Sequence, residues 1–362
     1  MKTLMVLAGG TGGHVFPALA VAERWRAEGG SVEWIGTGHG IENRLVPAYG
    51  IRLHRLAVHG IRGKGILHRL KAAVPLFKAL LQSWKLLHRS EVVVVLGMGG
   101  YVTGPAGIAA RMAGKPLVLH EQNAVAGLSN RWLAPWASRV LTGFPGVFSG
   151  NRKHVFVGNP VRQEIISLSN SVPPKSDELR ILVLGGSQGA QALNERVPEV
   201  LRRFWKNWHS RGLRTLSVLH QTGESQLEKT RKSYEGWGEG VQVEVSAFID
   251  NMQQAYHQAD LVICRSGALT VAELAAAAKP SILVPFPFAV DDHQTRNAEY
   301  LVQAGAAVLC PQPLLTEGAL EQALDHLRSP EVRAEMARQA FAMAKVDATD
   351  KIVNICREVA LG

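Results

Sequence analysis

The chain has 362 residues, of which 46% are hydrophobic and 19% charged, a composition typical of globular proteins and unlike that of fibrous or disordered ones. At ~150 residues per domain, this length predicts two domains, or three at most. The three cysteines form no CxxC pair, so neither a disulfide framework nor a zinc site is expected. No apolar run approaches the ~18 residues of a membrane span, and the N-terminus lacks the apolar stretch of a signal peptide, so we expect a cytoplasmic protein.

Short runs rich in valine, leucine and isoleucine recur through the first half of the chain, separated by helical patterns. They lie at 3–8, 31–36, 91–97, 115–120 and 138–143. Continuous apolar runs of this length are typical of parallel strands that are buried on both faces. They predict a doubly wound α/β domain.

A basic amphipathic segment at 62–90 stands out in this first half. Residues 1–160 hold 19 Lys and Arg but only six Glu and no Asp, a net charge of +13. The whole chain has a net charge of +10, so the excess of positive charge lies in the first half. The segment is interrupted by Pro75. Its candidate membrane patch consists of Ile66, Leu70, Leu76, Phe77 and Trp84 with the cations Lys64, Arg69, Lys71 and Lys78. Composition leaves open a core-packed helix with solvated cations, a helix in a membrane interface, and a nucleic-acid surface.

The second half of the chain repeats the same theme. Its apolar runs lie at 179–186, 213–220, 241–246, 259–267, 279–286 and 306–310. The polar, proline-bearing stretch at 167–178 is typical of a surface connection. We therefore predict two Rossmann-like, doubly wound parallel-sheet domains that face each other across a ligand cleft. The first spans 1–162 and the second 163–344, and a terminal helix at 345–362 has no packing partner that the sequence identifies.

Three of the strand-to-helix junctions are rich in glycine, at 7–20, 96–107 and 182–194. Glycine lets the backbone approach a ligand closely, and the helix that follows presents free N–H groups to an anion, so phosphate recognition is indicated. None of the three is a complete phosphate-binding fingerprint. Tight glycine turns also occur in parallel α/β folds for geometric reasons alone.

A fourth junction, LVICRSGALTVAELAAA, predicts a helix that begins near Gly267 with Ser266 as its N-cap. Glu273 then lies about two turns into the helix. A diphosphate at the helix N-terminus and a ribose diol on this carboxylate would form a nucleotide-diphosphate site. The alternative is that Glu273 is simply a good helix former.

The segment GGSQG also satisfies GxSxG, the nucleophile elbow of α/β hydrolases, with Gly185, Ser187 and Gly189 on a strand-turn-helix. A hydrolase needs an aspartate and a histidine later in the chain, and Asp292 and His293 are available. They are adjacent in sequence, however, and a whole α/β domain before the elbow is left unexplained. We therefore disfavour this alternative.

Seven segments, in order along nearly the whole chain, closely resemble the MurG family of bacterial glycosyltransferases with the GT-B fold. They are GGTGGHVFPALA (9–20), GMGGYVTGP (97–105), LHEQNAVAGLSNRWLA (119–134), VGNPVR (157–162), GGSQGA (185–190), CRSGALTVAE (264–273) and DDHQTRNA (291–298). The resemblance implies an inverting transferase that moves N-acetylglucosamine from UDP-GlcNAc to the C4 hydroxyl of lipid I, giving lipid II for peptidoglycan.

Inversion requires a base for the proton of the attacking hydroxyl and a means of holding the departing diphosphate. His14, directly after the first glycine turn, is the candidate base because imidazole titrates near neutral pH, and the resemblance supports this role. A purely positioning role for His14 stays open, as does Glu121 as another carboxylate. Acidic residues do not cluster near a glycine turn, so we expect no metal cofactor.

The resemblance also implies the residues that bind the donor. Ser187 matches the residue whose hydroxyl meets the diphosphate, Ile249 the position whose backbone reads uracil, and Glu273 the ribose-binding carboxylate. Gln294 and Asn297 fall where the family contacts the sugar, but His293 replaces a glutamine found in many relatives. The remaining donor-binding residues are Thr11, Gly12, Gly13, Asn123, Arg162, Ala268, Leu269 and Thr270.

As partners, the resemblance implies UDP-GlcNAc, undecaprenyl-linked lipid I, the anionic cytoplasmic face of the inner membrane and other cell-wall synthesis proteins. No nucleic-acid motif is present. Two alternatives stay open. One is a lipid glycosyltransferase with another acceptor, such as a diacylglycerol. The other is a non-catalytic protein whose basic half binds nucleic acid or anionic lipid.

Overall fold

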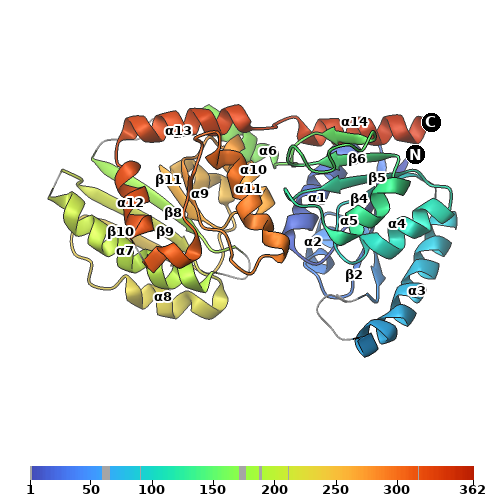
Figure 1. Ribbon diagram of the computed structural model, residues 1–362, viewed down its shortest axis with the longest axis horizontal. Coiled ribbons are helices and arrows are strands. Elements are labelled where there is room, and N and C mark those ends of the chain that lie inside the picture. Colours follow the sequence, from blue (N-terminus) through green and yellow to red (C-terminus); the bar gives the residue numbers. More distant parts are fainter. Residues whose placement is uncertain are drawn as a thin grey trace. The chain divides into compact units, whose positions relative to one another are not determined.

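The computed structural model describes residues 2–58, 66–89, 91–170, 177–186, 190–210, 212–316 and 318–362, without the side chains of 66–73, 89, 169, 170 and 316. The chain forms two compact units (Figure 1), one of Met1–Val161 with Lys345–Gly362 and the other of Arg162–Ala344. The first boundary thus falls one residue before the predicted one. The terminal segment, which the sequence left unplaced, returns to the first unit.

The first unit is built on a seven-stranded sheet in the order β3-β2-β1-β4-β5-β6-β7, with all neighbouring strands parallel. The chain runs outward from β1 to β3, crosses back, and continues outward from β4. The carboxyl ends of β1 and β4 are therefore neighbours at the point where the order reverses, which is where open α/β sheets bind ligands. The strands are β1 (Thr3–Leu7), β2 (Ser31–Thr37), β3 (Arg52–Leu56), β4 (Val92–Gly97), β5 (Leu117–Glu121), β6 (Arg139–Thr142) and β7 (His154–Phe156).

The second unit repeats this arrangement in a six-stranded parallel sheet of order β10-β9-β8-β11-β12-β13. Here β8 and β11 are the neighbours at which the order reverses. The strands are β8 (Glu178–Leu184), β9 (Thr215–Gln221), β10 (Val241–Ser246), β11 (Leu261–Cys264), β12 (Ser281–Leu283) and β13 (Val308–Leu309). The prediction of two doubly wound parallel sheets is confirmed.

The sequence pattern missed the two edge strands of the first sheet, β3 and β7. Both are short and lie largely open to solvent, since only Leu56 of β3 is fully buried and no residue of β7 is. An edge strand contacts fewer neighbours, so its sequence needs no continuous apolar run. The residues RLHRL and HVF therefore carry no strong strand signal.

Helices cover both faces of the first sheet. Leu4 and Val6 of β1 point into one core cluster, whereas Met5 and Leu7 point into the other, as the alternation along a strand requires. The helices of this unit are α1 (Gly12–Ala27), α2 (Glu42–Ala48), α3 (Ile66–Arg89), α4 (Thr103–Met112), α5 (Leu128–Leu133), the 3₁₀ turn η1 (Ala134–Trp136) and α14 (Ala348–Leu361).

The second unit carries more and shorter helices, and α7 supplies much of its core through Leu193, Val197, Leu201 and Phe204. The α-helices are α6 (Gln163–Ile166), α7 (Gln191–His209), α8 (Leu227–Ser233), α9 (Met252–Gln258), α10 (Ala268–Ala276), α11 (His293–Val302), α12 (Ala319–His326) and α13 (Pro330–Met343). The 3₁₀ turns are η2 (Ser167–Asn170), η3 (Glu224–Gln226), η4 (Val290–Asp292) and η5 (Gln312–Thr316).

From Ile66 to Arg89 the basic segment forms helix α3, which continues through Pro75 rather than ending there. Two members of the predicted patch, Leu76 and Trp84, are half-buried and pack against the core, so their assignment to an exposed patch is wrong. The reason is helical spacing, because both lie on the side of the helix that buries Leu87. Phe77 and Lys78 are exposed as predicted. Lys64 and the side chains of Ile66, Arg69, Leu70 and Lys71 lie outside the described residues.

The terminal helix α14 packs on α1 of the first unit. Its residues Ile352, Val353 and Cys356 are fully buried in the same cluster as Val21 and Ala22 of α1. Arg24 of α1 also pairs with Asp350, at 2.5 Å. The last helix is therefore an integral part of the first unit's core, although some 180 residues separate it from the rest of that unit.

This packing predicts that Ile352→Ala lowers the free energy of unfolding by about 2–5 kcal/mol, because it removes buried methyl groups and leaves a cavity. Leu361→Ala on the same helix is the matched control. Its side chain is 73% exposed, so a change within about 0.5 kcal/mol is expected. Urea unfolding of the two variants measures the difference, and equal midpoints would contradict the docking of α14.

The core of the second unit contains a histidine that has no contact with solvent. His220 of β9 lies 3.1 Å from Oδ1 of Asn194 through its Nε2 and 2.9 Å from the Tyr234 hydroxyl through its Nδ1. Asn194 uses its amide N–H to bond the Thr222 carbonyl at 3.0 Å, so its Oδ1 accepts from the imidazole. Burial lowers the pKa of His220 to about 3, and the ring is neutral at pH 7.

Acidification is therefore expected to destabilise the second unit. Unfolded histidine binds a proton below about pH 6.5, whereas folded His220 does so only near pH 3, so unfolding takes up a proton between these values. From pH 7 to pH 5 this residue alone should lower the free energy of unfolding by about 2 kcal/mol. Urea unfolding at both pH values should show that His220→Leu loses less stability on acidification than the original chain; equal losses would contradict the assignment.

Candidate active site

The first glycine junction, between β1 and α1, is held by a buried carboxylate that the sequence pattern did not single out. Glu42 is fully buried, and its Oε2 accepts from the Gly10 backbone N–H at 3.0 Å. Its Oε1 accepts from both the backbone N–H and the hydroxyl of Thr37, at 2.9 and 2.5 Å. Glu42 thus ties the loop after β1 to the end of β2. The only sequence signal is an acidic residue just after the glycine-rich GTGHG.

The junction after β4 lies directly against the junction after β1. A Cβ at Gly100 would come within 2.7 Å of the Gly9 carbonyl oxygen, and a Cβ at Gly99 within 2.8 Å of the His14 ring. Both glycines have a positive φ, 96° at Gly99 and 85° at Gly100. These glycines are required for close approach of protein to protein, and not only for approach to a ligand.

His14 lies in the first turn of α1, half-buried, with its ring against Gly99. Its Nδ1 is 2.8 Å from Oε1 of Gln122, which follows β5. Of the other predicted residues at this helix start, Thr11 and Gly13 are exposed and Gly12 is half-buried. Thr11 is the N-cap, and its side chain does not cap the helix. The structure therefore brings the β1, β4 and β5 junctions together around one imidazole.

Glu121, the alternative catalytic carboxylate, is buried and engaged on both oxygens. Oε1 accepts from the Asn123 backbone N–H at 3.1 Å, and Oε2 accepts from the Gly127 N–H at 2.9 Å and from the Asn130 amide at 2.8 Å. The carboxylate organises the connection from β5 to α5, including Asn123, a predicted donor residue. This geometry favours His14 over Glu121 as the base.

In the second unit, Glu273 of α10 is the centre of a cluster. Its Oε1 accepts from Nη2 of Arg162 at 3.1 Å, and its Oε2 accepts from the hydroxyl of Tyr256 at 3.1 Å. Burial raises the pKa of Glu273, and the Arg162 charge opposes that rise. The structure thus unites two predicted residues, Glu273 and Arg162, and adds Tyr256 of α9, which sequence reasoning missed because nothing in MQQAYHQ marks it.

The start of α10 differs in one respect from the prediction. Its N-cap is Gly267 and not Ser266. Ser266 is fully buried, and its hydroxyl has no hydrogen-bond partner among the described residues. The buried side chain cannot fold back over the helix end, so the extended backbone of Gly267 begins the helix. Ala268, Leu269 and Thr270 form the first turn that follows.

Two further predicted donor residues lie on α11, close to these loops. The Asn297 amide donates to the Ser266 carbonyl at 3.1 Å, and Oε1 of Gln294 accepts from the Phe286 N–H at 2.9 Å. The helix is preceded by Asp291 and Asp292, both in the left-handed region, with φ of 54° and 50°. Ile249 is half-buried in the loop before α9, and Ser187 lies outside the described residues.

The residues that a hydrolase triad would need are engaged elsewhere. Nδ1 of His293 donates to the Val290 carbonyl at 2.8 Å, and Oδ1 of Asp292 accepts from the Thr295 hydroxyl at 2.7 Å. In a triad the carboxylate orients the imidazole, but here each group bonds to its own helix start. The GxSxG match is therefore not supported by its required partners.

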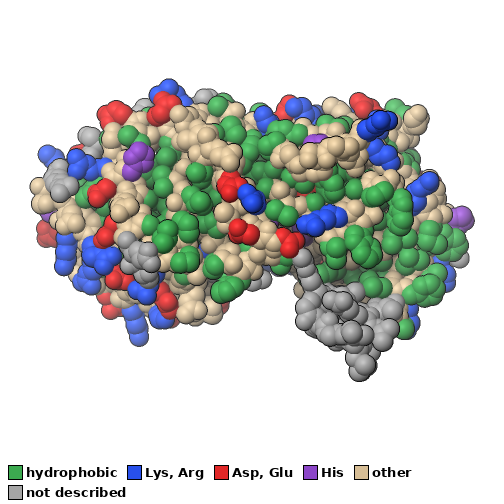
Figure 2. Space-filling view, in the orientation of Figure 1, with side chains coloured by type: hydrophobic (Ala, Val, Ile, Leu, Met, Phe, Trp, Pro, Cys, Tyr) green, Lys and Arg blue, Asp and Glu red, His purple; other side chains and the backbone are tan. Residues whose placement is uncertain are grey.

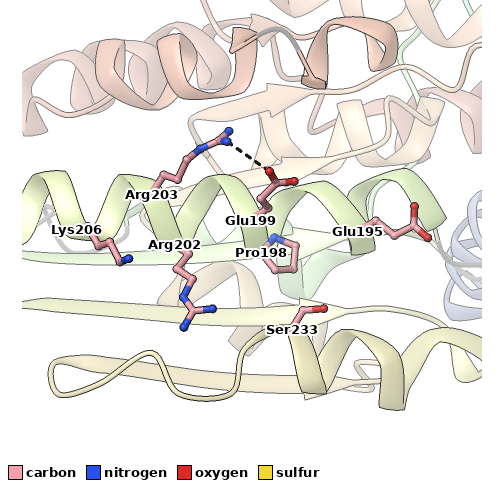
Figure 3. A pocket seen from close by; sticks show the side chains of 7 residues that line it. All are labelled: Glu195, Pro198, Glu199, Arg202, Arg203, Lys206 and Ser233. Atoms are coloured by element: carbon pink, nitrogen blue, oxygen red, sulfur yellow. Dashed lines mark hydrogen bonds and ion pairs between the residues drawn. The ribbon is translucent and has the colours of Figure 1, made fainter.

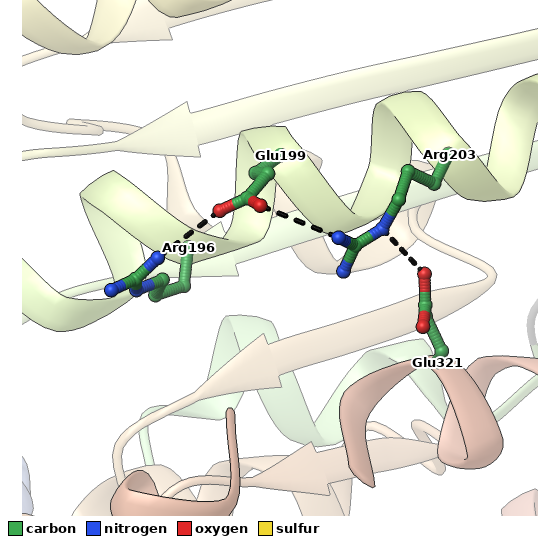
Figure 4. Close-up of polar contacts among 4 residues, drawn as sticks. All are labelled: Arg196, Glu199, Arg203 and Glu321. Carbon is green, nitrogen blue, oxygen red and sulfur yellow. Dashed lines mark hydrogen bonds and ion pairs between the residues drawn. The ribbon is translucent and has the colours of Figure 1, made fainter. Parts of the chain in front are cut away.

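A groove of about 320 Å³ lies on the outer side of α7 and α8 (Figure 3). It is lined by Glu195, Pro198, Glu199, Arg202, Arg203, Lys206 and Ser233. Glu199 forms ion pairs with Arg196 and Arg203, at 3.2 and 3.3 Å (Figure 4). Arg203 also pairs with Glu321 of α12, at 2.7 Å. These are exposed pairs, which contribute little to stability. None of the junction residues lines this groove.

Within the described part of the chain, no three His, Cys, Asp or Glu side chains are grouped as metal ligands would be. Over the same residues, no helix combines the length and the apolar character that a bilayer crossing requires.

Comparison with known proteins identifies the family. Residues 4–142 match the glycosyltransferase family 28 N-terminal domain, and residues 180–352 match the family 28 C-terminal domain. A UDP-N-acetylglucosamine--N-acetylmuramyl-(pentapeptide) pyrophosphoryl-undecaprenol N-acetylglucosamine transferase of Pseudomonas savastanoi pv. phaseolicola is 49% identical over 99% of both chains. The protein of the same name from Stutzerimonas stutzeri is 50% identical, again over 99% of both.

Among solved structures, the crystal structure of Acinetobacter baumannii MurG is similar with a TM-score of 0.83 and 39% identity, covering 99% of this chain and all of that one. The N-terminal match lies within the first unit, whereas the C-terminal match covers most of the second unit and runs on into α14 of the first. His14, Gly99, Gln122 and Glu273 lie inside the matched ranges. The chain is therefore a member of glycosyltransferase family 28, with the GT-B fold of MurG.

Proposed function

We propose that the protein transfers N-acetylglucosamine from UDP-GlcNAc to the C4 hydroxyl of the N-acetylmuramyl residue of lipid I, with inversion, to give lipid II. The observation that carries this proposal is the 49–50% identity, over 99% of both chains, to transferases that are named for this reaction. Two features of the site support it: the imidazole at the β1–α1 junction, and the carboxylate cluster on α10.

In this proposal, His14 is the general base. The acceptor O4 attacks the anomeric carbon of the donor, the new O4–C1 bond forms as the bond from C1 to the diphosphate oxygen breaks, and UDP departs with that electron pair. The hydroxyl proton passes to the imidazole, so no covalent enzyme intermediate is needed. Thr11, Gly12, Gly13 and Asn123 are proposed to contribute donor contacts from the first unit.

The second unit is proposed to hold the nucleotide. Glu273 accepts from the ribose hydroxyls while Arg162 and Tyr256 keep its carboxylate in place, and the first turn of α10 at Ala268, Leu269 and Thr270 faces the diphosphate with its N–H groups. Ser187, Ile249, Gln294 and Asn297 complete the donor contacts. Charge on the leaving UDP is stabilised by these N–H groups and by hydroxyls, so we propose that no metal cofactor takes part.

The activity is tested by incubating the protein with UDP-GlcNAc and a lipid I analogue, with EDTA present, and following UDP release and the disaccharide product. His14→Ala should lower kcat by about 10²–10⁴-fold, the usual contribution of a general base. Glu273→Gln should raise the KM for UDP-GlcNAc by about tenfold, since it removes a charged hydrogen-bond acceptor, and should change kcat little.

Two variants serve as controls for this assay. His54→Ala removes an imidazole on the edge strand β3, and Glu199→Gln removes a carboxylate from the exposed network of α7; both should keep the original kinetics. Release of UDP without formation of the disaccharide would indicate another acceptor, such as a diacylglycerol. UDP-GlcNAc binding without any turnover would favour a non-catalytic role, and loss of turnover in EDTA that Mg²⁺ restores would contradict the metal-free proposal.

We also propose that the protein is peripheral to the anionic cytoplasmic face of the plasma membrane, where lipid I is held. Exposed apolar side chains of the first unit gather on α3, α4, α5 and η1, and Figure 2 shows hydrophobic side chains over the region of α4 and α5. We call them the apolar surface: Val74, Phe77, Leu81, Met112, Leu128, Trp132 and Trp136.

The charges around the apolar surface fit an anionic lipid. The sequences of α3, α4, α5 and η1 contain no Asp or Glu, whereas Lys78, Lys85, Arg111 and Arg131 are exposed there. Trp132 is 73% exposed and Phe77 62%, and aromatic side chains of this kind favour the headgroup region of a bilayer. Cations at such a surface are worth about 1 kcal/mol each against anionic lipid.

Liposome binding tests this proposal. The affinity should rise with the fraction of anionic lipid and fall with salt. Phe77→Ser and Trp132→Ser should each weaken binding about tenfold or more, because each removes an aromatic side chain that the interface would bury. Phe341→Ser on α13, which is 43% exposed in the second unit, is the matched control. Unchanged binding in both first-unit variants would exclude the apolar surface as the membrane contact.

A further inference from the structure

His14 stands at the outer end of a hydrogen-bonded network that runs into the core of the first unit. The histidine network consists of His14, Gln122, His120 and the backbone carbonyl of Gly158. Nδ1 of His14 lies 2.8 Å from Oε1 of Gln122, whose Nε2 lies 2.9 Å from Nδ1 of His120. Nε2 of His120 lies 2.9 Å from the Gly158 oxygen. Gln122 and His120 are 1% and 0% exposed.

Two backbone carbonyls set the direction of every hydrogen bond in this network, because a carbonyl oxygen can only accept. Nε2 of Gln122 lies 2.9 Å from the carbonyl of residue 120 as well as from the His120 ring. The atom beside that carbonyl must be the amide nitrogen, so Oε1 necessarily faces His14. At the other end, the Gly158 carbonyl requires a proton on Nε2 of His120.

The two requirements agree with each other. Gln122 donates both of its amide hydrogens, one to the His120 carbonyl and one to the ring nitrogen Nδ1. Nδ1 of His120 must therefore lack a proton, which is the state of a neutral ring whose proton is on Nε2. Burial lowers the pKa of His120 to about 4, so the ring is neutral at pH 7.

We propose that Gln122 is a positioning residue that keeps the proton of neutral His14 on Nδ1 and so leaves the lone pair of Nε2 available to the substrate. The tautomer itself does not depend on the proposed function. Only the role of Nε2 as the atom that takes the proton of the acceptor hydroxyl rests on it. Oε1 of Gln122 has no hydrogen to give, and it can bond to Nδ1 of His14 only as an acceptor. The tautomer of His14 is therefore set by the His120 and Gly158 carbonyls, through Gln122.

The surroundings hold the network in this arrangement. The amide of Asn159 donates to the Gln122 carbonyl at 3.0 Å, which fixes the Gln122 backbone beside the Gly158 carbonyl. A side chain at Gly99 would also collide with the His14 imidazole. Hydrogen bonds and packing from a buried second layer of residues keep a catalytic group in one orientation.

The network also constrains the fate of the transferred proton. When the acceptor hydroxyl gives its proton to Nε2, His14 becomes an imidazolium that still donates from Nδ1 to Gln122. The amide oxygen stabilises the cation without taking the proton, and neutral His120 accepts from Gln122 and has no site for it. The proton must therefore leave from Nε2, to the departing product or to water.

Nitrogen NMR tests the tautomer directly and without turnover. The protein is labelled with ¹⁵N-histidine, and the signals of His14 are identified as those missing in His14→Gln. Two-bond ¹H–¹⁵N spectra near pH 8.5 should show neutral His14 with a proton on Nδ1 and none on Nε2. Gln122→Met, which keeps the side-chain length without the amide, should give a mixture of both tautomers. A proton on Nε2 of His14 in the original chain, or no change in Gln122→Met, would overturn the proposal.

Kinetics test whether Gln122 acts through His14. Gln122→Met should lower kcat about tenfold, the effect of one lost hydrogen bond. It should change the KM for UDP-GlcNAc less than about twofold, because Gln122 acts on the base and is not proposed to contact the donor. In a His14→Ala background the same change should have no further effect. An equal loss in both backgrounds would show that Gln122 acts on the fold and not on His14.

A matched control separates these results from general destabilisation. Tyr234→Phe also removes a hydrogen bond to a buried imidazole, that of His220, but in the unit that does not contain His14. It should leave both the His14 tautomer and kcat unchanged. If neither the original chain nor any variant transfers GlcNAc, the proposed function fails while the NMR result still decides the tautomer.

Discussion

The arrangement of both sites depends on the strand order of the two sheets. In each unit the chain reverses direction across the sheet beside its first strand, between β1 and β4 and between β8 and β11. Since all strands are parallel, the loops that leave β1, β4 and β5 emerge together at one edge, and so do those that leave β8 and β11. His14 and Gln122 are 108 residues apart in sequence, yet both lie beside each other at this edge, and Gly99 lies against the His14 ring.

Buried polar groups convert this meeting of loops into a defined geometry. Glu42 and Glu121 each accept hydrogen bonds on both carboxylate oxygens. Glu42 holds the loop after β1, and Glu121 holds the loop after β5. An ionised carboxylate that accepts several backbone N–H groups is a strong organiser of a loop, because leaving those donors unpaired in the core would be costly. In the proposed reaction these side chains shape the first unit's site and are not assigned a step. Arg162 and Tyr256 hold Glu273 in the second unit in a comparable way.

In the proposed reaction the first unit meets the membrane and the second unit holds the nucleotide. The basic half of the sequence forms the unit that holds His14 and the apolar surface, whose helices carry cations and no acids. Buried imidazoles are kept neutral by desolvation in both units, as the lowered pKa values of His120 and His220 indicate. An acceptor borne by an anionic membrane and a nucleotide donor make different electrostatic demands, and separate domains can meet both.

The sequence by itself determined the fold class, because continuous apolar runs separated by helical patterns admit little besides a parallel α/β sheet. It also marked the junctions, since glycine clusters after strands are local features. The edge strands β3 and β7 escaped it because an edge needs no apolar run, and Leu76 and Trp84 were misplaced because helical spacing does not say which side meets the core. Only the tertiary structure decided that Glu42, Gln122, His120 and Tyr256 belong to the sites. Their roles follow from hydrogen bonds between loops far apart in sequence, and from burial that removes water as the competing partner, and no local pattern encodes either.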